Sequence, residues 1–163
     1  MRLSSTQKAY IAGFLDGDGS VYVRAKPNTT YRFGYQIAPS IILFQSEKSA
    51  KYLQDLHTIL GLGYIRERND GMLELTVNKV DDIRSFIRIV KPFSLFKREQ
   101  LELLEHIIDT KQKVENEEDF AALLALVDTF RKLNYSKKRK VRVPVETKRG
   151  ISRTDKDIVR SLQ

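Results

Sequence analysis

The stretch from Ile11 to Ser20, IAGFLDGDGS, begins with apolar and small residues and ends in two acids set between glycines. It predicts a helix that starts just upstream, because SSTQ at positions 4–7 has the pattern of a capping box with Ser4 as its N-cap. The sequence DGDG favours an end to this helix near Asp16. The C-terminal end of a helix carries a partial negative charge that favours Lys or Arg. Two acids, Asp16 and Asp18, are therefore unexpected there in a chain whose net charge is +8.

Length and composition restrict the class of protein. The 163 residues predict a single domain over 1–163, with a core over about 4–133 and a basic C-terminal loop and short helix over about 134–163. The absence of cysteine excludes disulfides, thiol chemistry and Cys-based zinc sites. No apolar run approaches the roughly 20 residues of a membrane span, and the N-terminus lacks the apolar core of a secretory signal. We therefore expect no membrane partner and an intracellular protein.

The charges are unevenly distributed along the chain. Residues 1–98 hold 15 basic and 9 acidic residues, residues 99–131 hold 3 and 9, and residues 132–163 hold 11 and 3. The three segments thus carry net charges of +6, −6 and +8. This separation favours one surface that binds a polyanion and another that faces solvent, although a generic basic surface is the alternative.

Hydrophobic periodicity predicts an α+β domain. Alternation predicts strands over 20–26 and 31–44, and two shorter strands follow at 61–68 and 72–77 around the hairpin signal NDG. Helical patterns cover 46–60 and 82–90, and two further helices are expected from a Ser94 cap to Thr110 and from an Asn116 cap to Leu133. The order α-β-β-α-β-β-α with extra C-terminal helices indicates one antiparallel sheet. Pro39 predicts a bulge or a sheet edge nearby.

Small residues form a stripe on the first helix. Ala9, Gly13 and Gly17 are four apart and share one face, which allows a second helix to approach closely. The chain has no internal repeat, so the same helix of a second copy is the simplest partner, and twofold symmetry would place both DGDG ends together. The alternative is a first helix packed tightly on its own sheet. Divalent cations would make the resulting cluster of acids tolerable, because hard cations take carboxylate and carbonyl oxygens.

The segment YIAGFLDGDGS, residues 10–20, resembles the LAGLIDADG motif of homing endonucleases. The segments KPNTTYRF, GLGYIRER, KPFSLFKREQ and LNYSKKRK are similar, in order and spacing, to parts of the single-motif homodimeric members of this family. The resemblance implies an αββαββα core with a saddle-shaped sheet. It also implies a homodimer with an interface built on the motif helices, at Ala9, Ala12, Gly13, Asp16 and Gly17.

The resemblance further implies a site-specific DNA endonuclease encoded in an intron or intein. It also implies a place in an organelle (chloroplast or mitochondrion) or in a bacterial cytoplasm. Such an enzyme makes a double-strand break in a long, near-palindromic site by Mg²⁺-dependent hydrolysis across the minor groove and leaves short 3′ overhangs. Mn²⁺ would substitute for Mg²⁺, and Ca²⁺ would support binding only. The alternative is a non-cleaving protein of the same fold, an RNA-splicing maturase or a transcription regulator.

Site residues follow from the same resemblance. Asp18 matches the essential metal ligand, with the backbone carbonyl of Gly17 beside it. Gln45 and Lys97 match catalytic residues that order water around the scissile phosphate. The family's arginine position falls on Ser49, which leaves open whether Lys48 or Lys51 takes its place.

The exposed face of the sheet is expected to read DNA, because a β-ribbon fits the major groove. The predicted base-reading residues are Tyr22, Arg24, Lys26, Asn28, Arg32, Gln36, Ser40, Arg66, Arg68, Glu74 and Thr76. The basic run Ser136, Lys137, Lys138, Arg139 and Lys140 is suited to phosphate contacts, and a localisation signal or a generic tail is the alternative reading of that run.

Overall fold

The computed structural model describes residues 3–134, which fold around one four-stranded antiparallel sheet in the order β1-β2-β4-β3. The elements along the chain are α1 (Ser5–Asp18), β1 (Gly19–Pro27), β2 (Tyr35–Ser46), the 3-10 turn η1 (Glu47–Ser49), α2 (Ala50–Leu60), β3 (Tyr64–Glu67), β4 (Met72–Val77), α3 (Val80–Val90), α4 (Arg98–Gln112) and α5 (Glu117–Leu133). This order confirms the predicted α+β class and the αββαββα core followed by further helices.

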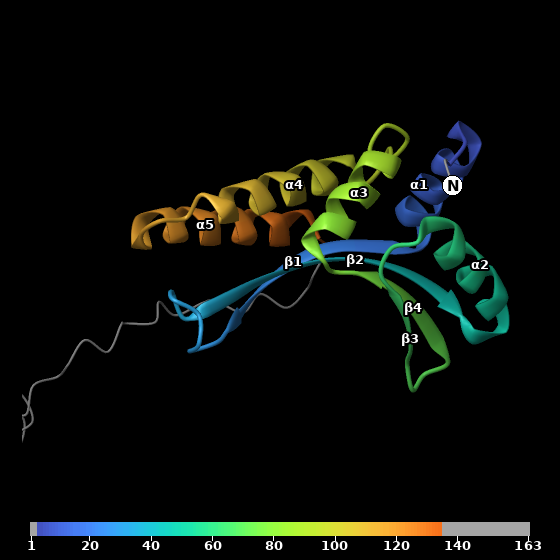
Figure 1. Cartoon of the computed structure of the whole chain (residues 1–163), viewed down its shortest axis with the longest axis horizontal. Helices are drawn as coiled ribbons and strands as arrows, with labels where there is room; N and C mark the ends of the chain where they lie inside the picture. Colours follow the sequence, from blue (N-terminus) through green and yellow to red (C-terminus); the bar gives the residue numbers. More distant parts are fainter. Residues whose placement is uncertain (1–2, 135–163) are drawn as a thin grey trace, which may run out of the picture.

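The helices lie on one side of a curved sheet, and no element of the described chain covers the opposite face (Figure 1). Alternation along β1 explains the two faces. Val21 and Val23 are buried beneath the helices, whereas Arg24 and Lys26 are exposed on the opposite face. The apolar stripes of the helices complete a single core, and Phe86 and Phe130 are among its largest fully buried side chains. Each such burial contributes roughly 1.5–3 kcal/mol to the free energy of unfolding.

Helix α1 begins and ends as its residues dictate. The predicted capping box is confirmed, because the backbone N–H of Gln7 donates to Ser4 Oγ (3.2 Å) and that of Ser4 donates to Gln7 Oε1 (2.9 Å). The helix runs two residues beyond Asp16, to Asp18, and β1 starts at once with Gly19. A Cβ on Gly19 would lie 2.6 Å from the carbonyl oxygen of Leu15. Glycine therefore permits the abrupt turn that places Asp18 where helix and sheet meet.

Pro39 lies in a central strand without a bulge. Its register with Val23 is continuous with the pairs on either side, so the expected bulge is absent from β2. β4 pairs only with the part of β2 from Ile41 to Ser46. At Pro39, β2 therefore has β1 as its sole paired neighbour, and the sheet is locally an edge, as predicted.

The two predicted caps of the last helices have different outcomes. Asn116 caps α5, as predicted, and the structure adds a full capping box with Asp119. Ser94 does not cap α4, which begins only at Arg98 with Lys97 in the N-cap position. The basic run 136–140 and the predicted C-terminal helix lie outside the described residues. Within residues 3–134, no helix is long and apolar enough to cross a membrane.

Candidate functional site

The carboxylate of Asp16 is fixed by the segment that connects α3 to α4. It accepts hydrogen bonds from the hydroxyl of Ser94 (2.6 Å) and from the backbone N–H groups of Leu95 (2.7 Å), Phe96 (3.2 Å) and Lys97 (3.1 Å). Ser94 is only 1% exposed, so its hydroxyl depends on this partner. Asp16 thus ties the end of α1 to the start of α4, and its side chain is directed within its own chain.

Lys97 is brought back to the end of α1 by this connection. Its ammonium group donates to the backbone carbonyl oxygen of Asp16, one of the last carbonyls of the helix. Such carbonyls lack intrahelical partners and carry the negative end of the helix dipole. The lysine therefore supplies the positive charge that α1 itself lacks in its last turn.

Charge and burial shift the pKa values of both groups. Burial alone would raise the pKa of Asp16, but the hydrogen bonds from Ser94 and the three backbone N–H groups together lower it below 3.8. Burial lowers the pKa of Lys97, and the negative charges of Asp16 and Asp18 offset part of that effect. The ammonium of Lys97 is therefore held close to both acids of the motif.

Replacing Asp16 with Asn should destabilise the fold in a pH-dependent way. At pH 7 we expect the free energy of unfolding to fall by about 1–2 kcal/mol, because charged acceptors make the stronger hydrogen bonds. The folded-state pKa of Asp16 is depressed, so this stabilisation is present above pH 3.8 and is lost as the pH falls through the folded-state value. Urea unfolding of wild type and variant, repeated from pH 7 to pH 2, should show the difference narrowing below pH 3.8.

The control for this variant is Asp55→Asn, which changes an exposed acid on α2. It should leave stability nearly unchanged at pH 7. A wild-type advantage over Asp16→Asn that stays constant down to pH 2 would contradict the role of the charge.

Asp18 is exposed at the end of α1. Among residues 3–134 it makes no hydrogen bond or ion pair, and its charge acts on Lys97 across the helix terminus. Gly17, in the same last turn, is also exposed, and a Cβ built on it would meet nothing within 4 Å. The structure thus leaves the carboxylate of Asp18 and the space beside Gly17 open, as a ligand-binding role requires. Residues 3–134 contain no group of three or more acidic or histidine side chains that could hold a metal ion.

Gln45 lies at the same end of the sheet. Leu43 pairs with Gly19, so Gln45, two residues further along β2, is level with the end of α1. Its Oε1 accepts the backbone N–H of Ser46 (2.9 Å), which leaves the amide nitrogen available. Ser49 is the half-buried residue before α2, and Lys48 and Lys51 beside it are exposed. The predicted catalytic residues Asp18, Gln45 and Lys97 therefore gather at one end of the sheet.

The uncovered face of the sheet carries many of the predicted DNA-reading residues. Register places Tyr22 beside Ser40, Arg24 beside Ala38, and Lys26 beside Gln36 on this face. Arg24 and Lys26 are exposed, and the guanidinium of Arg24 lies 4.7 Å from the centre of the Tyr22 ring. On the other half of the face, Arg66 pairs with Glu74. Arg66 and Arg68 are both exposed there.

Glu74 is not the exposed residue that alternation predicted. It is only 3% exposed, and Arg66 and Arg68 both donate to its carboxylate. Arg68 also donates to Asp70 through Nε (3.1 Å) and a terminal nitrogen (2.7 Å). Glu74 therefore orients two arginines, and its own oxygens are already occupied.

Four other predicted readers differ from expectation. Ser40 and Thr76 are each 6% exposed, so their predicted exposure was wrong. Arg32, which was expected in the strand over 31–44, lies with Asn28 in the turn at residues 28–34. Asn28 Oδ1 accepts both the backbone N–H (3.0 Å) and the hydroxyl (2.7 Å) of Thr30. This use of Oδ1 prevents the two-bond contact with adenine in this conformation.

The outer face of α1 is open along the predicted stripe. Ala9, Gly13 and Gly17 are exposed, and a Cβ added at Gly13 would meet nothing within 4 Å. These glycines are therefore not needed for packing of α1 on its own sheet. One predicted interface residue is corrected. Ala12 is fully buried in the core of its own chain, so its side chain cannot contact a partner helix. The carboxylate of Asp16 is bonded within the chain, and its place in the interface stays a prediction.

Sequence comparison identifies this arrangement. The family model described as LAGLIDADG endonuclease matches residues 11–107, more than half of the chain. DNA endonuclease I-CreI of Chlamydomonas reinhardtii is 31% identical over 132 residues, which cover 80% of this chain and 80% of that protein. DNA endonuclease I-CvuI of Chlorella vulgaris is 33% identical over 136 residues, with 82% and 83% covered.

Solved structures agree with the sequence matches. The homing endonuclease I-CvuI in complex with its target, in the presence of 2 mM Ca, matches with a TM-score of 0.78 and 30% identity. The match covers 84% of this chain and 87% of that one. A second complex of I-CvuI, with the I-CreI target in 2 mM Mg and the DNA not cleaved, also has a TM-score of 0.78. The fold that carries the acidic turn, Lys97 and the uncovered sheet face is thus shared with these endonucleases. The chain belongs to the LAGLIDADG family of homing endonucleases.

Proposed function

We propose that the chain is a sequence-specific DNA endonuclease that acts as a homodimer and hydrolyses one phosphodiester bond on each strand of a near-palindromic site. The observation that carries this proposal is the exposed carboxylate of Asp18 beside the ammonium of Lys97, at the end of an uncovered cationic sheet face. The names of the relatives I-CreI and I-CvuI, both DNA endonucleases, support the reaction class. Cleavage across the minor groove with short 3′ overhangs belongs to the same proposal.

The homodimer is supported by the open face of α1. Two such helices would pack through Ala9, Gly13 and Gly17, where small residues allow a close approach of backbones. Tyr10, on the outer side of the same helix, is 67% exposed in the single chain. A twofold axis along this face would bring the two copies of Asp18 together. Each active site would then draw on residues of both subunits.

A divalent metal fits the donors present at the end of α1. The carboxylate of Asp18 and the carbonyl of Gly17 are oxygen ligands of the kind that Mg²⁺ prefers. One subunit provides a single such carboxylate here, so the second copy and the phosphates of DNA would supply further oxygens. Bound there, a divalent cation would neutralise the charge that builds up on the phosphoryl group. We expect Mn²⁺ to replace Mg²⁺ and Ca²⁺ to support binding alone.

Lys97 and Gln45 would act on the phosphate and its water. Capping of the Ser94–Lys97 segment by Asp16 fixes the lysine backbone, so the ammonium is pre-positioned and needs little reorganisation. The free amide nitrogen of Gln45 would donate to a water or phosphate oxygen near the same place. Both residues stabilise negative charge and orient water.

The uncovered face would read the DNA. A strand of about ten residues spans about 33 Å and would cover roughly ten base pairs, so two subunits would read on the order of 20. The exposed residues available for major-groove contacts on this face include Arg24, Lys26, Arg66 and Arg68. Tyr64, which register places beside Thr76 on the same face, is also exposed (46%), and alternation had not singled it out. The half-buried Tyr22 lies beside Arg24, and the half-buried Gln36 lies opposite Lys26 on β2.

Asp70 should weaken DNA binding by competing for Arg68. Its carboxylate takes two N–H groups of Arg68 and raises the pKa of that guanidinium, so DNA must displace it. Asp70→Asn is expected to tighten binding about twofold to fivefold, the usual scale of an exposed ion pair. The logarithmic salt slope should steepen by about one unit if Arg68 gains a phosphate. Asp55→Asn, with the same change in net charge, should show a smaller gain in fluorescence anisotropy titrations.

The endonuclease proposal is tested with a randomised plasmid library. Wild-type protein is incubated with the library in Mg²⁺ and, separately, in Ca²⁺. Cleavage of a long site in Mg²⁺, with binding but no cleavage in Ca²⁺, supports the proposal. Tight binding in Ca²⁺ without scission in Mg²⁺ would favour a maturase or regulator on this fold.

A further inference from the structure

The turn at residues 28–34, which joins β1 to β2, is anchored to α5 by an aromatic stack. We propose that the stack of Phe33 on Phe120 fixes this turn and thereby sets how strictly the chain discriminates the outermost base pairs of its target. The inference rests on the proposed function, because it assigns a positioning role in DNA recognition to residues that do not touch the cleavage site.

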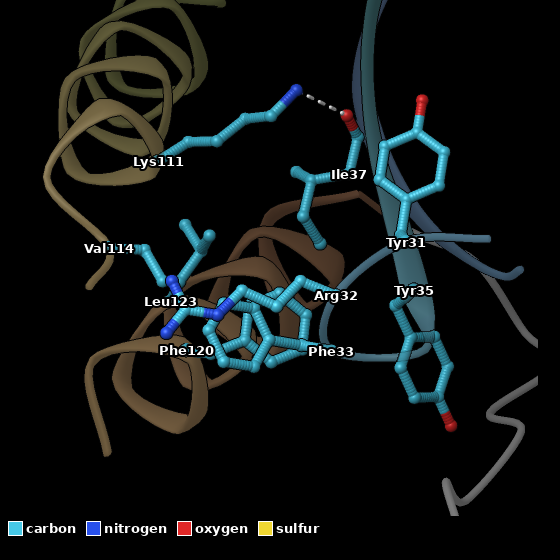
Figure 2. A pocket seen from close by; sticks show the side chains of 9 residues that line it. All are labelled: Tyr31, Arg32, Phe33, Tyr35, Ile37, Lys111, Val114, Phe120 and Leu123. Carbon is cyan, nitrogen blue, oxygen red and sulfur yellow. Dashed lines mark hydrogen bonds between the residues drawn. The ribbon is translucent and has the colours of Figure 1, made fainter. Parts of the chain in front are cut away.

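The stack joins the turn to α5 through two aromatic rings. The ring centres of Phe33 and Phe120 are 4.8 Å apart and their planes are inclined by 16°, while Tyr35 lies 6.5 Å from Phe120. Figure 2 shows the two phenylalanine rings overlapping where the first turns of α5 meet the loop. Phe120 is 8% exposed, so its ring is held firmly by the core. A rigid helix thus presents a fixed platform to the turn.

A pocket lies beside the stack, so Phe33 has few other side chains packed against it on that side. The pocket measures about 160 Å³ and opens between the turn, α5 and the end of α4 (Figure 2). Across it, the ammonium of Lys111 donates to the carbonyl of Ile37 (3.1 Å) and holds the strand rather than the turn. Apolar packing is therefore discontinuous here, and truncation of Phe120 would remove the contact that places Phe33.

The turn is internally rigid, so an anchor at one residue places all of it. The N–H of Asn28 donates to the carbonyl of Gly34 (2.8 Å), and the N–H of Gly34 donates to that of Tyr31 (2.8 Å). Asn28 Oδ1 also holds Thr30, and Gly34 takes a φ of 73° that favours glycine. The turn would therefore shift as a unit if Phe33 moved.

The same stack directs a cation toward solvent. The guanidinium of Arg32 lies 5.0 Å from the centre of the Phe33 ring, and the side chain is exposed. A guanidinium over an aromatic face is held by the ring quadrupole, so the direction of Arg32 follows that of Phe33. Phe120, Phe33 and Arg32 thus form a continuous series of stacked side chains that runs from the core to the exposed turn (Figure 2).

The position of the turn along the hairpin predicts which base pairs it affects. β1 has nine residues between the Asp18 end and the turn, a distance of about 30 Å at 3.3 Å per residue. At 3.4 Å per base pair, that distance is roughly nine pairs from the centre of the site. Loosening the turn should therefore relax recognition at the outer pairs and leave the central pairs and the bond-breaking step unchanged.

The test compares Phe120→Leu with Phe130→Leu. The two positions share one helix and one substitution, and Phe130 is more deeply buried (1% exposed) but does not line the pocket. For Phe120→Leu we expect discrimination at the outer pairs to fall about fivefold, the value of a weak single-pair preference. In the same variant, KM for the preferred site should rise while kcat stays within about twofold of the wild-type value. The control Phe120→Tyr keeps the aromatic ring and should behave as wild type. Phe130→Leu should lower thermal stability without changing the discrimination measured at each base pair of the target.

Hydrogen exchange in the free protein separates this inference from the proposed function. The backbone amides of Tyr31 and Gly34 are hydrogen-bonded inside the turn. Their exchange rates should rise about tenfold in Phe120→Leu and stay the same in Phe130→Leu, because exchange there requires only local opening of the turn. Unchanged exchange in Phe120→Leu, or an equal loss of discrimination along the whole site, would overturn the anchor. Phe33→Leu, which removes the other ring, should reproduce the Phe120→Leu result. A wild-type protein that cuts no library site contradicts the proposed function instead, while the exchange result still decides whether the anchor exists.

Discussion

Asp18→Asn is expected to abolish DNA cleavage and to leave DNA binding intact. The substitution keeps the size of the side chain and removes the negative oxygen that the proposed metal site requires. Loss of a single essential group in a hydrolytic site lowers kcat on the order of 10⁴-fold. Asp18 is exposed and has no hydrogen bond among residues 3–134, so the fold should be unaffected. Supercoiled plasmid bearing a selected site, incubated in Mg²⁺, gives the cleavage rate directly.

Binding is the second measurement on this variant. The variant loses a contact to the bound cation but also loses a negative charge that repels the phosphates. Because these two effects oppose each other, the dissociation constant in Ca²⁺ should change by less than about threefold. Asp81→Asn, an exposed acid at the start of α3, is the matched control and should cut as the wild type does. Retained cleavage in Asp18→Asn would exclude this carboxylate as a metal ligand. Loss of both cleavage and binding would assign Asp18 a structural role instead.

Local signals in the sequence predicted most of the fold correctly. The capping boxes at Ser4 and Asn116 and the hairpin at residues 68–72 depend on residues within four positions of each other, and the structure contains all three. Alternation along β1 also assigned the buried and exposed faces correctly. These features are readable because the interacting groups are close in the chain and their geometry is fixed by the backbone.

Long-range contacts limited what the sequence could predict about the site. The Asp16 carboxylate meets Ser94, 78 positions later, and no local pattern reports such a contact. Ser94 was therefore predicted as a helix cap, although its hydroxyl serves the motif helix. Alternation placed Glu74 on the correct face, but two arginines and the curvature of the sheet bury it. Periodicity identifies the face on which a residue lies, and packing determines how deep it lies.

Ala12 illustrates the same limit on a helix. Ala9, Ala12 and Gly13 are all small residues, but the helical repeat of 3.6 separates Ala12 from the exposed stripe. The structure buries Ala12 completely and leaves Gly13 open. By contrast, the use of Asn28 inside its own turn was available from the sequence NTT, since Asn side chains commonly bond to the backbone two residues on.

Gly13→Leu should convert the proposed dimer into folded monomers. A leucine here meets nothing inside the subunit, and leucine is favoured over glycine in a helix by roughly 0.5–1 kcal/mol, so the fold should be slightly stabilised. In the dimer, two added side chains would lie between closely packed backbones. Overpacking costs about 1–3 kcal/mol per site, so the dissociation constant should rise on the order of 100-fold or more. Sedimentation equilibrium should then report the subunit mass of 18.9 kDa in place of twice that value.

Cleavage links this interface to the chemistry. If each active site draws on both copies of Asp18, monomeric Gly13→Leu should lose double-strand cleavage although its own catalytic side chains are intact. The control is Ala121→Leu, which adds a leucine at an exposed position on α5 and should leave both mass and cleavage unchanged. A Gly13→Leu protein that sediments as an unaltered dimer would place the subunit contact elsewhere. The added leucine leaves the catalytic side chains of its own subunit unchanged. A monomer that still cuts both strands at the wild-type rate would therefore show that one subunit holds a complete active site.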